Sequence, residues 1–389
     1  MKSKICFVVQ RYGLEVNGGA ELHCRMLAEH MHRHYSQVHV LTTKAIDYMT
    51  WKNEYLCGHE TINGIEVYRF PVARERNQDV FNTINSELLS GRLEEDRERE
   101  WIEKQGPAVP ELLAFLKEKK DDYDVFIFFT YLYYPTVLGI GEVKEKAILI
   151  PTAHDEPFLK MKIMGKVFHA PRFLFYNTEE ERKLIQGKFH NADIYSELGG
   201  VGVETPEKTD ADGFKRKHAL NRFLLYVGRI DEGKNCHKLF QYYQEYKKRN
   251  PNGVKLVLMG KPVIPVPKDK DIVSLGFVDD QEKFDGIAAA DLLVMPSAFE
   301  SLSIVVLEAM SLLTPVVVNG SCTVLKGHCY KSNGALYYGN YFEFEGVVNY
   351  ILEHPQIVES MCCNAQRYVE ENYRWDRIEE RLCRLIEKI

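Results

Sequence analysis

The chain has 389 residues, enough for two domains of ordinary size. With 45% hydrophobic and 27% charged residues, it has the composition of a soluble globular protein. The net charge of −6 gives no sign of a nucleic-acid-binding surface. No segment approaches the ~18 apolar residues of a transmembrane helix, and Met1 to Gln10 is too short for a signal peptide.

The nine cysteines show no paired C-x-x-C spacing, which argues against a zinc site or a disulfide framework. Reduced thiols in a cytosolic protein fit this pattern better. We therefore expect a cytoplasmic protein, or one that lies peripherally on the inner surface of a membrane.

The first half of the chain contains short apolar runs of the length of buried strands. Ile5–Val9, a glycine loop, a helix and a second strand at Val38–Leu41 form a βαβ unit. Further strands are predicted at Val67–Val72, Val125–Phe129, Ala147–Ile150, Phe173–Tyr176 and Ile194–Leu198. The polar stretch between Arg74 and Lys120, with a helix around 94–103, is expected to be a solvated face.

Gly18 and Gly19 stand at the start of the first helix, which is predicted from about Ala20 to His34. The glycines do not fit G-x-G-x-x-G, and no acidic residue ends the second strand, so a dinucleotide oxidoreductase is disfavoured. The two glycines suit close approach of the backbone to an anion or a sugar. A tight turn that merely needs glycine is the alternative.

His154 follows the strand that ends at Ile150, at the end of the strand where open α/β sheets bind ligands. It is either a ligand contact or a structural histidine. The next segment, 158–168, interleaves three lysines with large apolar side chains. Such a segment suits an anionic membrane or a lipid-phosphate acceptor. The alternative is a helix that packs its apolar residues on the sheet and leaves its lysines solvated.

Residues 204–221 are polar and are expected to be a linker, after which the strand pattern restarts. Strands are predicted at Phe223–Val227, Val254–Met259, Ile272–Leu275, Leu292–Met295 and Pro315–Val318. Helices fill the chain from Phe342 onward, the last from about Asp376 to Lys388. Arg229 and Lys234 bracket the loop after the first of these strands, where two cations and a helix N-terminus would converge on a diphosphate; surface charge is the alternative. Asn235 is expected to cap the helix that follows.

The stretch from Phe299 to Met310 organises the second half. Ser303 is expected to cap a buried helix from Ile304 to about Leu313. Glu308 lies inside that apolar helix without a neighbouring Lys or Arg, and burying an unpaired carboxylate is costly. Vicinal hydroxyls of a ligand would satisfy it. Glu300 lies on the loop at the carboxyl end of the strand. The alternative is that Glu300 and Glu308 are two ordinary charges around a buried crossover, without a ligand.

Together, Gly18-Gly19-Ala20-Glu21, Val227-Gly228-Arg229 with Lys234-Asn235, and the stretch from Glu300 to Glu308 resemble the retaining GT-B glycosyltransferases of family 4. The resemblance spans nearly the whole chain and implies an α/β fold of two Rossmann-like domains facing a central cleft. It implies an acceptor domain at 1–203, the linker 204–221, a nucleotide-sugar domain at 222–374, and a helix at 375–389 that returns to the first domain.

The resemblance also implies the site residues. Arg229 and Lys234 would bind the diphosphate, Glu300 the donor-sugar hydroxyls and Glu308 the ribose. Gly276 to Val278 would line the base, and His154 would contact the donor sugar near its reacting carbon. The full donor site would comprise Gly18, Gly19, Gly228, Arg229, Lys234, Gly260, Phe277, Val278, Glu300, Ser301, Leu302, Ser303 and Glu308, with His154, Arg229, Lys234 and Glu300 as the catalytic residues. Many family members carry glycine where Ser303 stands, which is a departure.

The reaction implied is transfer of a sugar from a nucleotide-sugar donor to a glycan, lipid-linked or small-molecule acceptor, with the anomeric configuration kept. The leaving phosphate would accept the acceptor's proton. The fold implies no metal and no cofactor, and the two D-x-D matches at 122–124 and 269–271 precede strands, so we expect them to be turn residues. A sugar-nucleotide epimerase and a non-catalytic nucleotide-sugar binding protein remain as alternatives.

Overall fold

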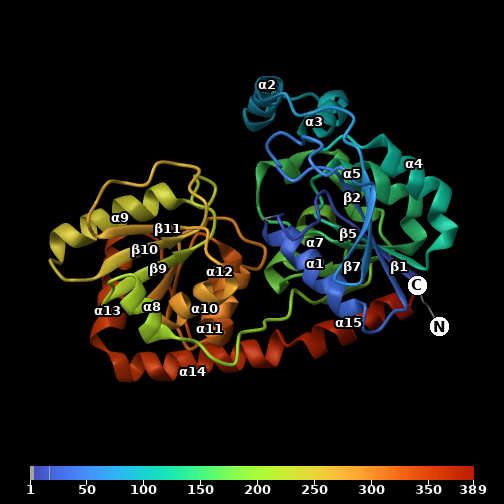
Figure 1. The fold of residues 1–389 in the computed structure, drawn as a ribbon. Coiled ribbons are helices and arrows are strands. Elements are labelled where there is room, and N and C mark those ends of the chain that lie inside the picture. The colour runs from blue at the N-terminus through green and yellow to red at the C-terminus, as the bar shows by residue number, and fades with distance from the viewer. Residues whose placement is uncertain (1–3, 17) are drawn as a thin grey trace. The chain divides into compact units, whose positions relative to one another are not determined.

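The computed structural model describes residues 4–16 and 18–389, and the chain divides into two compact units (Figure 1). Unit 1 comprises Met1–Val201 and Trp375–Ile389, and unit 2 comprises Gly202–Arg374. The chain therefore leaves unit 1, completes unit 2 and returns. Where unit 2 begins and ends, its two backbone segments are paired, since Val203 N–H donates to the Tyr373 carbonyl at 2.8 Å.

In the described part of unit 1, eight strands form one sheet in the order β3-β4-β2-β1-β5-β6-β7-β8. All neighbouring strands are parallel except β3 and β4, which are antiparallel. The strands are β1 (Lys4–Val8), β2 (Gln37–Thr43), β3 (His59–Ile62), β4 (Ile65–Phe70), β5 (Val125–Phe129), β6 (Ala147–Ile150), β7 (Phe173–Tyr176) and β8 (Ser196–Leu198).

Helices cover both faces of this sheet. Those of unit 1 are α1 (Gly19–Met31), α2 (Gln78–Leu89), α3 (Glu98–Gln105), α4 (Pro110–Lys119), α5 (Tyr134–Gly139), α6 (Ile163–His169), α7 (Glu179–Phe189) and α15 (Trp375–Glu387), with short 3₁₀ turns at Glu95–Arg97, Lys120–Asp122, Ile140–Lys146 and Pro157–Lys160. Helices α1 and α15 pack against each other, and the His30 ring stacks on Trp375 with centroids 3.6 Å apart. Glu379 of α15 accepts hydrogen bonds from His30 and His34, each at 2.6 Å.

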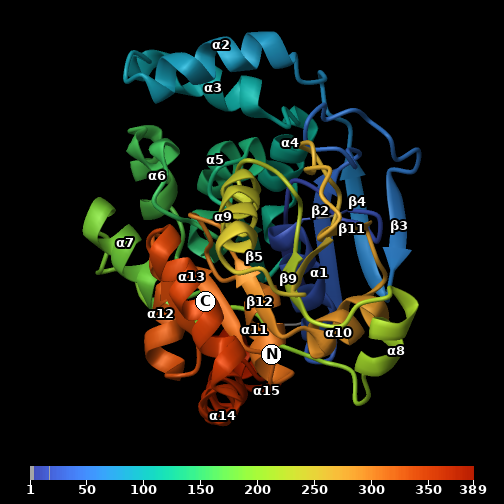
Figure 2. The same cartoon turned by 90° about the vertical axis from the view of Figure 1, so that its left-hand side faces the viewer.

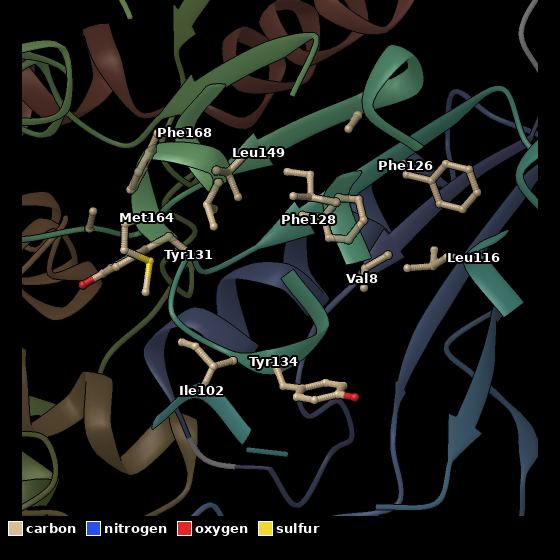
Figure 3. Close-up of a cluster of buried hydrophobic side chains, with 14 of the residues drawn as sticks. Val8, Ile102, Leu116, Phe126, Phe128, Tyr131, Tyr134, Leu149, Met164 and Phe168 are labelled. Atoms are coloured by element: carbon tan, nitrogen blue, oxygen red, sulfur yellow. The ribbon is translucent and has the colours of Figure 1, made fainter. Parts of the chain in front are cut away.

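One cluster of buried hydrophobic side chains in the described part of unit 1 lies between the sheet and helices α2 to α7. Figure 3 shows alternate residues of neighbouring strands, such as Val8, Phe128 and Leu149, pointing the same way toward apolar helix and loop residues such as Met164 and Phe168. This alternation follows from the strand period of two. It builds a sheet buried on both faces, as parallel sheets require.

Unit 2 has a smaller sheet, in which six described strands run parallel in the order β11-β10-β9-β12-β13-β14. They are β9 (Phe223–Val227), β10 (Lys255–Met259), β11 (Ile272–Gly276), β12 (Leu292–Met295), β13 (Val316–Asn319) and β14 (Leu336–Tyr338). The helices are α8 (Ala211–Lys217), α9 (Cys236–Arg249), α10 (Asp280–Ala289), α11 (Ile304–Ser311), α12 (Thr323–Ser332), α13 (Tyr341–Glu353) and α14 (Pro355–Asn372). Helix α9 lies on one face of this sheet, and α10 and α11 lie on the other (Figures 1 and 2).

Residues 204–221, which we expected to be a linker, belong to unit 2. Within them α8 packs on α10, buries Phe214 and pairs Lys217 with Glu282 at 2.6 Å. The polar composition that suggested a linker is explained by the exposed face of this helix.

In the lysine-bearing segment 158–168, apolar side chains pack inward and the lysines are solvated, as the alternative to a membrane segment predicted. Met161, Met164 and Phe168 are buried in the core of unit 1, while Lys160, Lys162 and Lys166 are exposed. These three apolar side chains therefore pack in the core of unit 1, while Phe158 and Ile163 are half-buried at its edge. Among the described residues, no helix combines the length and the apolar character that crossing a membrane needs.

Candidate functional site

The site in unit 2 is built at the carboxyl ends of parallel strands. Gly228 follows β9 and Gly260 follows β10, and both have φ in the region that favours glycine (146° and 140°). A Cβ on Gly260 would lie 1.9 Å from the Gly228 carbonyl oxygen, so a side chain has no room there. The two glycines thus let two strand-end loops pack backbone against backbone.

Asp231 organises the cations of the first loop. It is buried, one carboxylate oxygen accepts from the Arg229 Nε, and the other accepts from the backbone N–H of Lys234 at 2.8 Å. Sequence reasoning named both cations and missed this carboxylate. The only local signal that could have pointed to Asp231 is its position three residues before Lys234, since aspartate side chains often accept from a backbone N–H at that spacing.

Lys234 and Glu300, 66 residues apart, are brought into contact. The Lys234 Nζ lies 2.6 Å from Glu300 Oε1, and both side chains are largely shielded. The pairing arises because β12 is the neighbour of β9 in the sheet. An incoming diphosphate would have to share Lys234 with Glu300 and Arg229 with Asp231.

Asn235 occupies the N-cap position of α9 as predicted, but not with the predicted bond. Its backbone is left-handed (φ 59°) and its side chain makes no capping bond. The side-chain amide instead donates to the Pro296 carbonyl at 3.1 Å, and Asn319 donates to the same oxygen at 2.9 Å. The ends of β12 and β13 are thereby tied to the start of α9.

Ser303 occupies the N-cap position of α11 as predicted, but not with the predicted bond. Its φ of 68° is left-handed, its side chain makes no capping bond, and its buried hydroxyl has no partner within the described chain. Helix α11 also ends at Ser311, two residues before the predicted end. The left-handed backbone explains why glycine suits this position, and a helix start without a side-chain cap leaves N–H groups for an anion or hydroxyl.

Behind this loop, His328 bonds to the Leu302 carbonyl through Nε2 at 2.8 Å and to the Tyr368 hydroxyl through Nδ1 at 2.9 Å. His328 is buried and fixes the loop that carries Glu300 and Ser301. No sequence motif pointed to this histidine.

Glu308 is not the unpaired carboxylate that the sequence suggested. Lys283 of α10 reaches it, with Nζ 2.9 Å from Oε1. Burial raises the pKa of Glu308, and the Lys283 charge opposes that rise. Because Glu308 is paired, an unsatisfied charge can no longer be used to argue for a ribose contact. The Glu308 carboxylate still lies about one helical turn from Ser303, where α11 starts.

The expected base contacts lie after β11. Gly276 has φ 71°, Phe277 is 73% exposed, and Val278 is half-buried. An aromatic ring exposed to this extent has a face available for stacking.

The remaining predicted residues are in unit 1. Gly18 is the N-cap residue of α1 and Gly19 its first residue. A Cβ on Gly18 would lie 2.1 Å from Oε2 of Glu21, a buried carboxylate that Arg11 binds at 2.6 Å. Gly18 is therefore needed to accommodate this buried ion pair.

His154 lies on the loop after β6 and is half-buried. Its Nδ1 is 3.0 Å from Glu156 Oε1, and the Tyr131 hydroxyl donates to the same oxygen at 2.6 Å. Burial raises the pKa of Glu156 to about 7. The predicted site residues thus form one set in unit 1 and a larger set in unit 2.

Within the described residues there is no group of three or more His, Cys, Asp or Glu side chains arranged to bind a metal ion. Asp124, in one of the D-x-D matches, accepts the backbone N–H of Lys4 at 3.0 Å. This aspartate has a structural role at the start of β5.

Known protein sequences match part or nearly all of this chain. Residues 221–340 match the family model described as Glycosyl transferases group 1. An uncharacterized glycosyltransferase of Methanocaldococcus jannaschii is 24% identical and covers 96% of this chain and 95% of its own length. A glycosyltransferase 1 domain-containing protein of Xenopus tropicalis is 25% identical, over 56% of this chain and 67% of its own.

Solved structures match the whole chain. HepE from Anabaena, solved in complex with UDP-glucose, has a TM-score of 0.71 at 16% identity and covers 99% of this chain and 100% of its own. WaaG, a glycosyltransferase involved in lipopolysaccharide biosynthesis, has a TM-score of 0.67 at 14% identity, covering 98% and 99%. The chain therefore has the GT-B fold, and the part of unit 2 that carries Arg229, Lys234, Glu300 and Glu308 matches the group 1 glycosyl transferases.

Proposed function

We propose that this protein is a retaining glycosyltransferase of family 4, which moves a sugar from a nucleotide-diphosphate donor to a glycan, lipid-linked or small-molecule acceptor. The observation that carries the proposal is the Arg229–Asp231–Lys234–Glu300 network. It places two cations and two carboxylates at adjoining strand ends, within the stretch that matches the group 1 family.

In the proposed mechanism, Arg229 and Lys234 stabilise the negative charge that develops on the leaving diphosphate. The starts of α9 and α11, which lack side-chain caps, add a favourable helix dipole. Glu300 accepts from hydroxyls of the donor sugar. The acceptor attacks from the side that the diphosphate leaves, and a phosphate oxygen takes its proton, so the anomeric configuration is kept.

The cations provide the charge that a metal ion would otherwise supply, so we propose that the reaction needs no metal and no cofactor. Because HepE was solved with UDP-glucose, UDP-sugars are the first donors to test. We propose the cytoplasm as the compartment, because nine cysteines without paired spacing suit a reducing environment.

The test is to incubate the protein with a panel of nucleotide-sugars and mixed acceptors, with and without EDTA, and to determine product anomers by NMR. A product with the donor's anomeric configuration, formed equally in EDTA, is expected. Inversion would refute the retaining assignment, and loss of activity in EDTA would refute metal independence. Conversion of the donor sugar without an acceptor would indicate an epimerase, and tight donor binding without transfer or hydrolysis would indicate a binding protein.

A further inference from the structure

A pocket lies in unit 1, and none of the site residues named above lines it. It has a volume of about 210 Å³, and we call it the Arg76 pocket after its central side chain. Its polar and aromatic lining includes Trp51, Arg74, Arg76, Asn77, Glu103 and Lys104. A space of this size is sufficient for a phosphate or carboxylate group with a few water molecules.

Arg76 is the unusual member of this lining. Its Nε donates to the Gln105 carbonyl at 3.1 Å, and a terminal nitrogen donates to the Gln105 side-chain oxygen at 3.2 Å. The guanidinium lies over the Phe81 ring at 4.8 Å and the Trp51 ring at 5.2 Å. Burial lowers the pKa of Arg76. Arg76 is thus a partly buried cation in contact with two aromatic rings.

Among the described residues, no carboxylate lies within ion-pairing distance of Arg76, which binds only amide oxygens. Two acidic residues do line the pocket. Glu103 is already shared by Arg74 at 3.5 Å and Arg99 at 3.3 Å, and Glu75 is exposed. With Lys104 the lining is net positive. Asp47 acts on Arg76 only through longer-range attraction. A shielded cation without a contacting carboxylate is costly, which is expected where a ligand supplies the negative charge.

The pocket is rigidly framed. Trp51 is 1% exposed although its φ of 56° is left-handed, and its indole N–H donates to the Gln105 carbonyl at 2.7 Å. Non-glycine residues in this region are strained, and such strain gathers at functional sites. The backbone carbonyl that orients Arg76 is thus itself fixed by a strained, buried tryptophan.

The pocket also lies at the edge of the sheet where ligands are expected. Trp51 follows β2, Arg76 follows β4, and Tyr133, which packs on Trp51 at 5.6 Å, follows β5. These strands are parallel to β6, whose carboxyl end carries His154. The Arg76 pocket and the His154 loop therefore share the carboxyl edge of one sheet.

We propose that the Arg76 pocket binds an anionic group, a phosphate or a carboxylate, carried by the acceptor substrate. Binding of the anion rests on the pocket alone, whereas its assignment to the acceptor rests on the proposed function. The Arg76 Nε and Nη2 already donate to Gln105, so the N–H groups of Nη1 are the ones that would donate to the anion, and Lys104 adds a second charge.

The test titrates inorganic phosphate into the full-length protein by calorimetry, with UDP in excess to occupy Arg229 and Lys234. Arg76→Gln is expected to weaken phosphate binding about 10- to 100-fold, as loss of a charge-assisted hydrogen bond implies. Lys104→Gln should weaken it several-fold. Lys188→Gln, an exposed lysine on α7, is the matched control and should bind like the wild type.

Competition then separates the sources of the anion. A hexose 6-phosphate, a hexuronate and the neutral hexose are added against phosphate, and the charged sugar that displaces it through Arg76 identifies the group. Equal phosphate affinity of wild type and Arg76→Gln, or no phosphate binding at all, overturns the proposal. If Arg76→Gln does not fold, Lys104→Gln combined with Arg74→Gln decides by the same criterion. Phosphate binding that depends on Arg76 in a protein that transfers no sugar would refute the proposed function and leave the anion site standing.

Discussion

Replacing Lys234 with methionine tests the proposed diphosphate contact most directly. The substitution removes one cation and keeps the length of the side chain. A charge-assisted hydrogen bond is worth about 1.5–3 kcal/mol, which corresponds to roughly a 10- to 150-fold change in dissociation constant. In the free protein, Lys234 already binds Glu300 at 2.6 Å, and a diphosphate must compete for it. We therefore expect the lower end, about 10-fold weaker binding of UDP.

Calorimetry with UDP and with uridine separates a phosphate contact from general damage. Lys234→Met should lose affinity for UDP and keep its affinity for uridine. Lys270→Gln, an exposed lysine near the opposite end of β11, is the control and should change neither. Adding Glu300→Gln to Lys234→Met tests the ion pair. In the single variant the Glu300 carboxylate faces the diphosphate without its cation, and the double variant removes that carboxylate charge. Unchanged UDP affinity, or an equal loss for uridine, would refute the assignment.

Three further predictions concern unit 2 and the helix that returns to unit 1. Glu308→Gln should weaken UDP binding several-fold but leave a 2′,3′-dideoxy analogue unaffected in calorimetry; equal loss for both ligands would assign Glu308 to the Lys283 pair alone. Ser303→Gly should raise the free energy of unfolding by about 1 kcal/mol in chemical denaturation, because glycine relieves the left-handed φ, whereas Ser303→Ala keeps the strain and should gain less. The pKa of Glu379 lies below its ordinary value. Burial alone would raise this pKa, but hydrogen bonds from His34 and His30 lower it. Its stabilisation should therefore be complete above the ordinary value of about 4.5 and be lost as the pH falls below it, and Glu379→Gln should flatten that acid limb; an unchanged limb contradicts the role.

The strands could be predicted best where both faces of the sheet are covered. Phe223–Val227 and Leu292–Met295 have the predicted bounds because each is an unbroken apolar run in a buried parallel sheet. The edge strand His59–Ile62 was missed because its residues are polar and partly exposed. Leu336–Tyr338 was missed because three residues form no pattern.

The candidate site could be predicted as a set of loops but not as a set of pairs. Loops that follow strands can be read along the chain, which is how Arg229, Lys234 and Glu300 were found. Which strands are neighbours cannot be read there, so the contact of Lys234 with Glu300 was not predicted. The Lys283–Glu308 pair was missed for the same reason, since 25 residues and a change of helix separate its members.

The return of the chain to unit 1 has a consequence for how the protein is made. Unit 2 is formed by one continuous segment of the chain, and Val203 and Tyr373 are hydrogen-bonded where that segment begins and ends. Unit 1 lacks α15 until residues 375–387 have left the ribosome, which is roughly 10–35 s after Val201 at ~5–20 residues per second. Until then the face of α1 around His30 lacks Trp375 and Glu379. The N-terminal unit, although it is synthesised first, is therefore completed last.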